Sequence, residues 1–213
     1  MKEIRRIENE IQKWEDGKMS ESFFSLNPQR LRDELDRWYT KEQDGHLEYH
    51  GKVFQVGTYD MELPSGKIVR RELVVNPQVV CMVPVDMNGD IWMIRQMRPV
   101  SQFPILELPA GKIDEGEWPA QAAIREMGEE TGFEAKNLLK IGSFFSSPGW
   151  CTEFVHCFLV SDLSASFLTA DTDEEIEVVK VSPSEVMGKI NKGEINCAKT
   201  ITALLLALPK INS

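Results

Sequence analysis

The sequence between Gly111 and Gly132 constrains the fold more than any other part of the chain, because it sets four glutamates around one arginine. The residues are Glu117, Arg125, Glu126, Glu129 and Glu130. Side chains three and four positions apart share one face of a helix, so the last three glutamates project together. Their repulsion costs about 0.2–0.5 kcal/mol per exposed pair, and a shared hard divalent cation, which prefers oxygen ligands, offsets it. The spacing predicts a helix with a metal-binding face.

An apolar stripe is predicted on the opposite side of this helix, formed by Ala120, Ala123, Ile124 and Met127. Such a stripe buries a helix against a core and leaves its charged face accessible. A plain solvated acidic face is the alternative interpretation, since many charge runs on helices are of that kind. The two interpretations differ in whether the glutamates have a ligand.

Every specified position from Gly111 to Phe133 matches one family pattern: Gly, five residues, Glu, seven residues, Arg-Glu, an apolar residue, any residue, Glu-Glu, any residue, Gly, an apolar residue. Chance agreement at all of its fixed letters is rare at ordinary amino-acid usage. The segment resembles the Nudix box. The resemblance implies an α/β fold, a Nudix-type α/β/α sandwich with a mixed sheet, and hydrolysis of a nucleoside diphosphate linked to another group. It also implies Mg²⁺ or Mn²⁺ as cofactor, with two or three ions at the site.

Composition excludes several other classes of protein. The 213 residues carry a formal net charge of -10, which argues against a nucleic-acid surface. No apolar run approaches the roughly 18 residues of a membrane span, and the charged start is followed by no apolar signal core. The four cysteines lack CxxC spacing and are expected to be reduced. We therefore expect a cytoplasmic protein with neither nucleic-acid nor membrane partners.

The chain divides into two parts by pattern. Residues 1–45 are predicted to form an N-terminal helical extension, because apolar residues recur at helical spacing from Ile4 to Trp14 and again from Leu31 to Trp38. Residues 46–213 are predicted to form the catalytic domain. Strands are expected between Leu47 and Val75 with a turn at Pro64-Ser65-Gly66, and near Val79 to Val85, Ile91 to Gln96, Leu139 to Phe145, Glu153 to Val160 and Ile176 to Val181. Two helices are expected after Ser182 and from about Ala198 to Leu208.

The residues just before the box helix add a further metal ligand. The chain turns at Gly111, so the backbone carbonyl of Ala110 can face the helix, and carbonyl oxygens are good ligands for a hard cation. Gly111 is predicted to allow either close approach or a positive φ. The resemblance implies that the Ala110 carbonyl, Glu126 and Glu130 hold the metals, and that Glu129 is a further ligand or supports them.

Four residues of the box are assigned structural roles. Glu117 in the loop and Arg125 in the helix are expected to pair and tie the loop down. Gly111 and Gly132, at the two ends of the pattern, complete this set.

The general base is expected from an acidic segment, residues 171–175, that precedes a predicted strand. Hydrolysis of a pyrophosphate needs charge neutralisation, an in-line water and a base. In relatives a loop here swings over the site and carries alternating glutamates, but this chain has Thr172 at one of those positions. Glu174 or Glu175 is left as base or extra metal ligand, with Glu129 as the candidate on the helix. A solvated loop is the alternative.

The substrate is predicted from a proline. Pro148 lies fifteen residues past Phe133, a distance that marks the ADP-ribose pyrophosphatase branch. By the same resemblance, the candidate substrate contacts are Arg71, Glu72, Arg98, Pro148 and Gly149, with the upstream residues often acting across a dimer interface. Arginine suits bidentate phosphate contacts, and an ordinary surface charge is the alternative for each.

The preferred interpretation is a homodimeric enzyme that hydrolyses ADP-ribose to AMP and ribose 5-phosphate with magnesium. A pyrophosphatase of GDP-mannose, another nucleoside diphosphate sugar or a dinucleotide is the alternative within the class. A non-catalytic Nudix ligand sensor is the alternative outside it. The intact box glutamates and the absence of a basic patch in the sequence disfavour the sensor.

Overall fold

The computed structural model describes residues 46–165 and 175–211 of the chain. The two helices predicted within residues 1–45, together with Thr172 and Glu174, lie outside these residues. The elements are β1 (His46–His50), β2 (Gln55–Glu62), β3 (Ile68–Val75), β4 (Val79–Pro84), β5 (Ile91–Gln96), β6 (Ile105–Glu107), β7 (Ala110–Lys112), α3 (Pro119–Thr131), β8 (Phe133–Phe145), β9 (Phe154–Ala165), β10 (Ile176–Val181), α4 (Pro183–Asn191) and α5 (Ala198–Ile211).

The centre of the molecule is a mixed four-stranded sheet in the order β7-β4-β9-β8. β4 and β9 are parallel, and the other neighbours are antiparallel. Every residue of β4 is buried, because alternate side chains enter two different apolar clusters. Cys81 and Val83 join one cluster, and Val80 and Met82 join the other. A continuous apolar run thus places β4 between two core layers.

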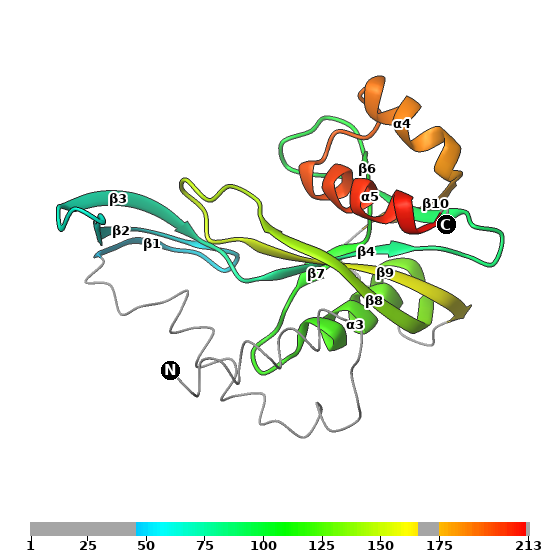
Figure 1. Cartoon of the computed structure of the whole chain (residues 1–213), viewed down its shortest axis with the longest axis horizontal. Coiled ribbons are helices and arrows are strands. Elements are labelled where there is room, and N and C mark those ends of the chain that lie inside the picture. The colour runs from blue at the N-terminus through cyan, green and yellow to red at the C-terminus, as the bar shows by residue number, and fades with distance from the viewer. Residues whose placement is uncertain (1–45, 166–174, 212–213) are drawn as a thin grey trace.

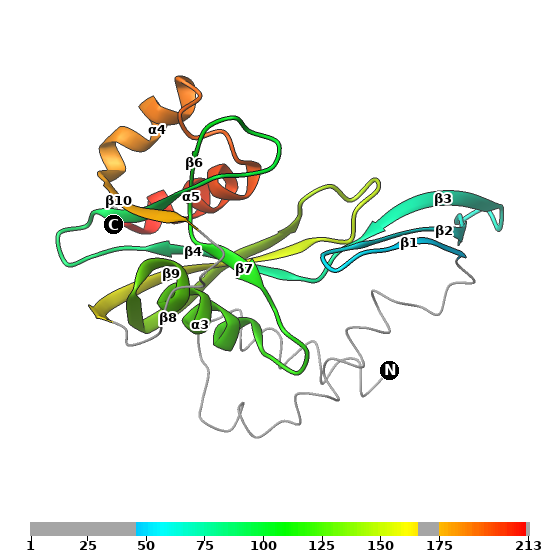
Figure 2. The same cartoon turned by 180° about the vertical axis from the view of Figure 1, so that it is seen from behind.

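Each of the two layers contains helices. α3 covers one face of the central sheet, while α4 and α5 lie on the other side together with the second sheet, β10-β5-β6 (Figure 1; Figure 2). Ala123 and Met127 of α3 pack in one cluster, and Ala203 and Leu204 of α5 pack in the other. The α/β/α sandwich with a mixed sheet predicted from the sequence is confirmed.

The structure corrects two details of the prediction. β8 begins at Phe133, directly after the box helix, and β9 runs on to Ala165, so both strands are longer than expected. The buried stripe of α3 is also rotated. Ile124 is 44% exposed whereas Ala122 is fully buried, because the face of the helix that packs on the sheet turns toward Glu130.

The first three strands form a separate antiparallel sheet, residues 46–75, which we call the arm. The arm extends from one end of the body (Figure 1). Its hairpin turn contains Gly66 with φ +80°, as the Pro64-Ser65-Gly66 signal predicts. Val74 joins it to the body: its N–H donates to the carbonyl of Trp150 (2.8 Å), and its carbonyl accepts from Thr152 N–H (3.0 Å).

All four cysteines lie in the described part of the chain as free thiols, three of them buried. Among the described residues, no helix has the length and apolar character needed to cross a membrane.

Candidate active site

The side chain of Glu126 packs closely against Gly111. A Cβ added at Gly111 would lie 1.9 Å from Cδ of Glu126 and about as close to both carboxylate oxygens. Gly111 is not among the glycines with positive φ, so close approach, rather than a left-handed backbone, is the reason for glycine here. The carboxylate of Glu126 therefore packs directly on the backbone of β7.

Glu130 lies one helical turn further on and faces the same strand. Its side chain is buried, with the residue 9% exposed, and Oε2 accepts the backbone N–H of Ala110 at 2.8 Å. Ala110 and Gly111 of β7 thus face Glu130 and Glu126 of α3. The sequence grouped these four residues, and the fold brings them together.

Arg125 is the centre of a hydrogen-bond network. Its Nε and Nη2 donate to the two carboxylate oxygens of Glu117 at 2.9 and 2.8 Å. Its Nη1 donates to Glu126 at 2.8 Å and to Glu129 at 2.9 Å, and Nη2 also reaches the carbonyl of Lys112 at 2.9 Å. The pairing of loop and helix expected from the sequence is present, and the contacts to Glu126 and Glu129 were not foreseen. Arg125 therefore ties the loop, the helix and β7 together.

The carboxylates around Arg125 are unequally compensated. Burial acts to raise the pKa of Glu117, but hydrogen bonds from Arg125 and from the Asp114 N–H outweigh it, so that pKa is lowered. Burial raises the pKa of Glu126, and here Arg125 does not outweigh burial and the repulsion from Glu129 and Glu117. Arg125 in turn has a raised pKa, owing first to its hydrogen bond with Glu117. One arginine thus leaves the inner carboxylate short of positive charge.

The donor set at this place fits a hard divalent cation. Glu130 offers a buried carboxylate and Glu126 a partly buried one, Glu129 is more exposed beside them, and β7 offers backbone carbonyls. Among the described residues, no three His, Cys, Asp or Glu side chains already converge as a metal cage. Glu126 and Glu129 each give one carboxylate oxygen to Arg125. The other oxygen of each would be the one to hold an ion.

The ends of α3 are fixed by local sequence. Pro119 occupies the first turn, and the N–H of Trp118 donates to Oε1 of Gln121 at 2.9 Å. Gly132 closes the helix in the left-handed region with φ 70°, and its N–H donates to the carbonyl of Gly128 at 3.1 Å. These caps set the register in which the glutamates face β7.

Arg98 and Glu175 lie at one end of β5. Arg98 follows β5, and its Nε donates to Oε2 of Glu107 at 2.7 Å. Glu175 directly precedes β10, whose first residue, Ile176, pairs with Gln96 of β5. Glu107 was missed by the sequence reasoning, although a lone acid between Leu106 and Leu108 is a signal of a buried, partnered carboxylate.

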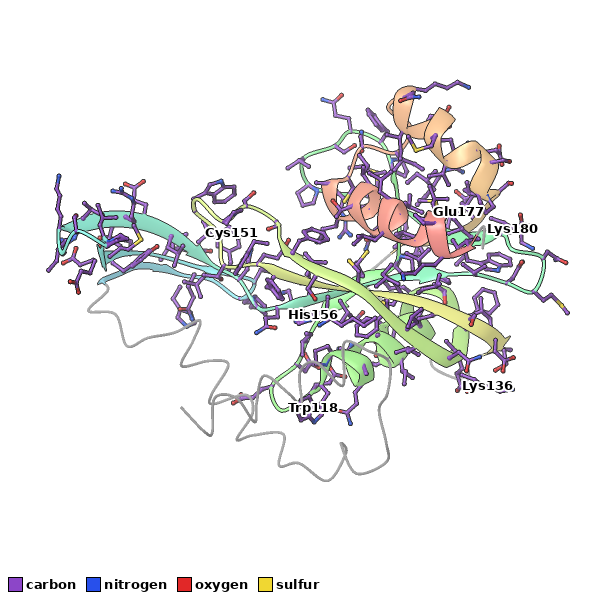
Figure 3. All side chains as sticks on the ribbon, viewed as in Figure 1. Trp118, Lys136, Cys151, His156, Glu177 and Lys180 are labelled. Atoms are coloured by element: carbon purple, nitrogen blue, oxygen red, sulfur yellow. The ribbon has the colours of Figure 1, made fainter. Side chains whose placement is uncertain are left out.

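The remaining substrate candidates lie elsewhere in the molecule. Arg71 and Glu72 are on β3 of the arm, and Pro148 and Gly149 are in the loop between β8 and β9 that contacts the end of β3. In Figure 3, Cys151 marks the junction of arm and body, while Trp118 marks the start of α3 on the lower side of the sheet. Within one chain these four residues are separated from the box helix.

Comparison with known proteins shows the family to which the chain belongs. The model of the NUDIX domain matches residues 75–204. The chain is 40% identical over 158 residues to an ADP-ribose pyrophosphatase of Bacillus subtilis (strain 168), covering 73% of this chain and 85% of the relative. It is 32% identical over 160 residues to a GDP-mannose pyrophosphatase of Cronobacter sakazakii (strain ATCC BAA-894), covering 69% and 83%. The chain belongs to the Nudix family of hydrolases.

A solved structure supports the fold. The crystal structure of an ADP compounds hydrolase superposes with a TM-score of 0.68 at 24% sequence identity, covering 80% of this chain and 95% of that chain. At this identity the likeness concerns the fold alone.

Proposed function

We propose that this protein hydrolyses ADP-ribose to AMP and ribose 5-phosphate in the presence of magnesium or manganese. The observation that carries the proposal is the packing of the partly buried Glu126 and the buried Glu130 on the Ala110–Gly111 backbone. The 40% identity to an ADP-ribose pyrophosphatase supports the choice of substrate.

The chain's own residues divide the work of the reaction. Glu126, Glu130 and the carbonyl of Ala110 would hold the ions, with Glu129 beside them. When bound, divalent ions neutralise charge on the pyrophosphate oxygens and make the attacking water more acidic. Arg98 binds the diphosphate through its terminal nitrogens. Glu117, Arg125, Gly111 and Gly132 keep the loop and the helix in register without touching the substrate.

A carboxylate takes the proton from water as the new P–O bond forms and the bridging oxygen leaves with its electron pair. Glu129, Glu174 and Glu175 are the candidates. Glu129 is 32% exposed, and Glu175 is exposed at the same end of β5 as Arg98. Separate Gln variants of the three identify the base by the largest loss of kcat and by loss of the acidic limb of the pH profile, because a base acts only when deprotonated.

We propose further that the active form is a homodimer. The arm exposes large apolar side chains, including Ile68 at 65% and Tyr49 at 54%. Arg71 and Glu72 of the arm are separated from the box helix of their own chain (Figure 1). A second copy that covers the arm buries this apolar surface and lets Arg71 and Glu72, with the Pro148–Gly149 loop, contact the nucleotide of its site.

A second candidate function is hydrolysis of GDP-mannose or another nucleoside diphosphate sugar. The 32% identity to a GDP-mannose pyrophosphatase favours it, and the box pattern by itself does not name the leaving group. The discrimination therefore depends on residues outside the box.

The decisive assay incubates the pure protein with ADP-ribose, ADP-glucose, GDP-mannose and a dinucleoside polyphosphate, with magnesium or with chelator. We expect ADP-ribose to show the highest kcat/KM, with AMP and ribose 5-phosphate as products and no turnover in chelator. Faster turnover of GDP-mannose selects the second candidate. Turnover unchanged by chelator contradicts both.

A further inference from the structure

Glu107 is a carboxylate in an apolar setting. It ends β6 between Leu106 and Leu108, both of which belong to the core, and its side chain is only 7% exposed. A buried carboxylate is costly unless charged or polar partners compensate it. The partners of Glu107 therefore indicate what this position is for.

Two donors reach Glu107 from different parts of the chain. Nε of Arg98 lies 2.7 Å from Oε2, and the thiol of Cys197, just before α5, lies near the same carboxylate, which helps to raise the pKa of that thiol. Burial raises the pKa of Cys197, so this thiol stays protonated and remains a donor at neutral pH. The neighbouring backbone is also anchored, because Leu108 N–H donates to Oγ1 of the buried Thr200 at 3.0 Å. Glu107 is thus a fixed acceptor.

Arg98 is held in a different way from Arg125. All three side-chain nitrogens of Arg125 donate hydrogen bonds to acceptors of the protein. Within residues 46–165 and 175–211, Arg98 makes its one side-chain hydrogen bond through Nε, and its side chain is 32% exposed. The two terminal nitrogens, which suit bidentate binding of a phosphate, are left for another acceptor.

We propose that Glu107 is a positioning residue, which holds Arg98 by its Nε so that the two terminal nitrogens meet the diphosphate of the substrate. Glu107 is three residues before Ala110, whose N–H donates a hydrogen bond to Glu130. One short backbone segment therefore positions both Arg98 and the residues of the proposed metal site. The inference deepens the proposed function and rests on it, since it takes Arg98 as the phosphate contact.

A four-protein comparison tests the coupling: wild type, Glu107→Gln, Arg98→Ala and the double variant, each assayed for kcat and KM with ADP-ribose and for binding of ADP-ribose by calorimetry in chelator. Loss of a charge-assisted hydrogen bond corresponds to about a tenfold weakening. We expect Glu107→Gln to raise KM and Kd about tenfold, with kcat changed less. In the Arg98→Ala background the same change is expected to have less than about a twofold effect.

Glu177→Gln is the matched control. Arg95 is on β5, the strand that Arg98 follows, and its pair with Glu177 (3.2 Å) is exposed, with side chains 42% and 66% accessible. Glu177 is labelled in Figure 3. We expect KM, Kd and the melting temperature of this variant to stay at the wild-type values. Glu107→Leu, which removes the acceptor at similar size, is expected to weaken binding at least as much as Glu107→Gln.

The outcomes distinguish a failure of the positioning role of Glu107 from a failure of the proposed function. Wild-type KM and Kd in Glu107→Gln, or an equal loss in the Arg98→Ala background, overturn the positioning role while the enzyme still hydrolyses ADP-ribose. A wild type that turns over a different nucleoside diphosphate sugar contradicts the proposed substrate alone, and the same four proteins are then compared on that sugar nucleotide. A wild type that neither binds nor hydrolyses any of them contradicts both.

Discussion

Around α3, polar side chains find their partners inside one chain, whereas in the arm large apolar side chains lie in solvent. Arg125 alone contacts Glu117, Glu126 and Glu129, and Glu130 is bonded to β7. In the arm, Ile68 is 65% exposed, and the pair between Arg70 and Asp60 is on the surface. The difference teaches that the carboxylates of the candidate metal site are arranged within a single chain, whereas the exposed apolar surface of the arm is what the proposed dimer would cover.

The largest loss of activity is expected from a change in α3, where the carboxylates have their partners within one chain. Glu130→Gln keeps an acceptor for the Ala110 N–H but removes the charge, so folding should persist while kcat falls by about three orders of magnitude. The measurement is steady-state hydrolysis of ADP-ribose alongside thermal unfolding. The control is Glu115→Gln. Glu115 is an exposed glutamate in the loop between β7 and α3, and the variant should match the wild type. Near-normal turnover by Glu130→Gln would contradict the assignment of Glu130 as a metal ligand.

A second prediction concerns the contact between Gly111 and Glu126. Gly111→Ala forces its Cβ onto the Glu126 carboxylate, which must move from β7, so we expect kcat/KM to fall by about tenfold to a hundredfold. Gly188→Ala is the control, because a Cβ there meets open space in α4. It should leave kcat/KM unchanged and raise the free energy of unfolding by about 0.5–1 kcal/mol. Equal activity of the two variants would show that Glu126 has no fixed place.

The arm gives the third prediction. Ile68→Asp puts a charge on the exposed apolar surface and should convert a dimer to a monomer, with lower turnover at low protein concentration. Light scattering after size-exclusion chromatography gives the mass. Met87→Asp, at a 99% exposed position in the turn before β5, should remain dimeric. A monomeric wild type with full activity removes the contrast between the two regions.

The last prediction concerns stability alone, at the buried His156 of β9 in the central sheet. Burial, and then the charge of Lys140, lower the pKa of His156 to about 3, and its Nε2 lies 2.7 Å from Oε1 of Gln78. The unfolded chain takes up this proton near pH 6.5 and the folded chain does not. Stability is therefore lost as pH falls from about 6.5 toward 3, by up to about 1.4 kcal/mol per pH unit. Urea titrations of His156→Gln should show a shallower decline than the wild type over this window, and parallel curves count against it.

The sequence was most informative where the reasons for structure are local. The spacing of Glu126 and Glu130 and the turn at Gly66 each depend on neighbouring residues, and each has the geometry that its pattern predicts. Strand ends were less accurate. β8 and β9 extend each other by long-range pairing between Phe133 and Ala165, which leaves no mark in the sequence of either strand.

The site was only half predictable for the same reason. The box residues lie close in sequence, so a helix and a turn suffice to join them. Arg98 and Glu107 meet across the loop between β5 and β6, and Cys197 joins them from the other end of the chain. Arg71 lies on the arm, and no sequence pattern states where the arm of a second copy would lie. The predicted roles of these residues remain to be tested.

The central claim is that Glu126 and Glu130 hold divalent metal against β7, and manganese binding tests it most directly. Free Mn²⁺ is measured by electron paramagnetic resonance during titration of the wild type, the Glu126→Gln and Glu130→Gln variants, and the combination of the two changes. The account predicts binding by the wild type, weaker binding by each single variant and loss of the site in the combination. Equal binding by all four proteins would contradict it.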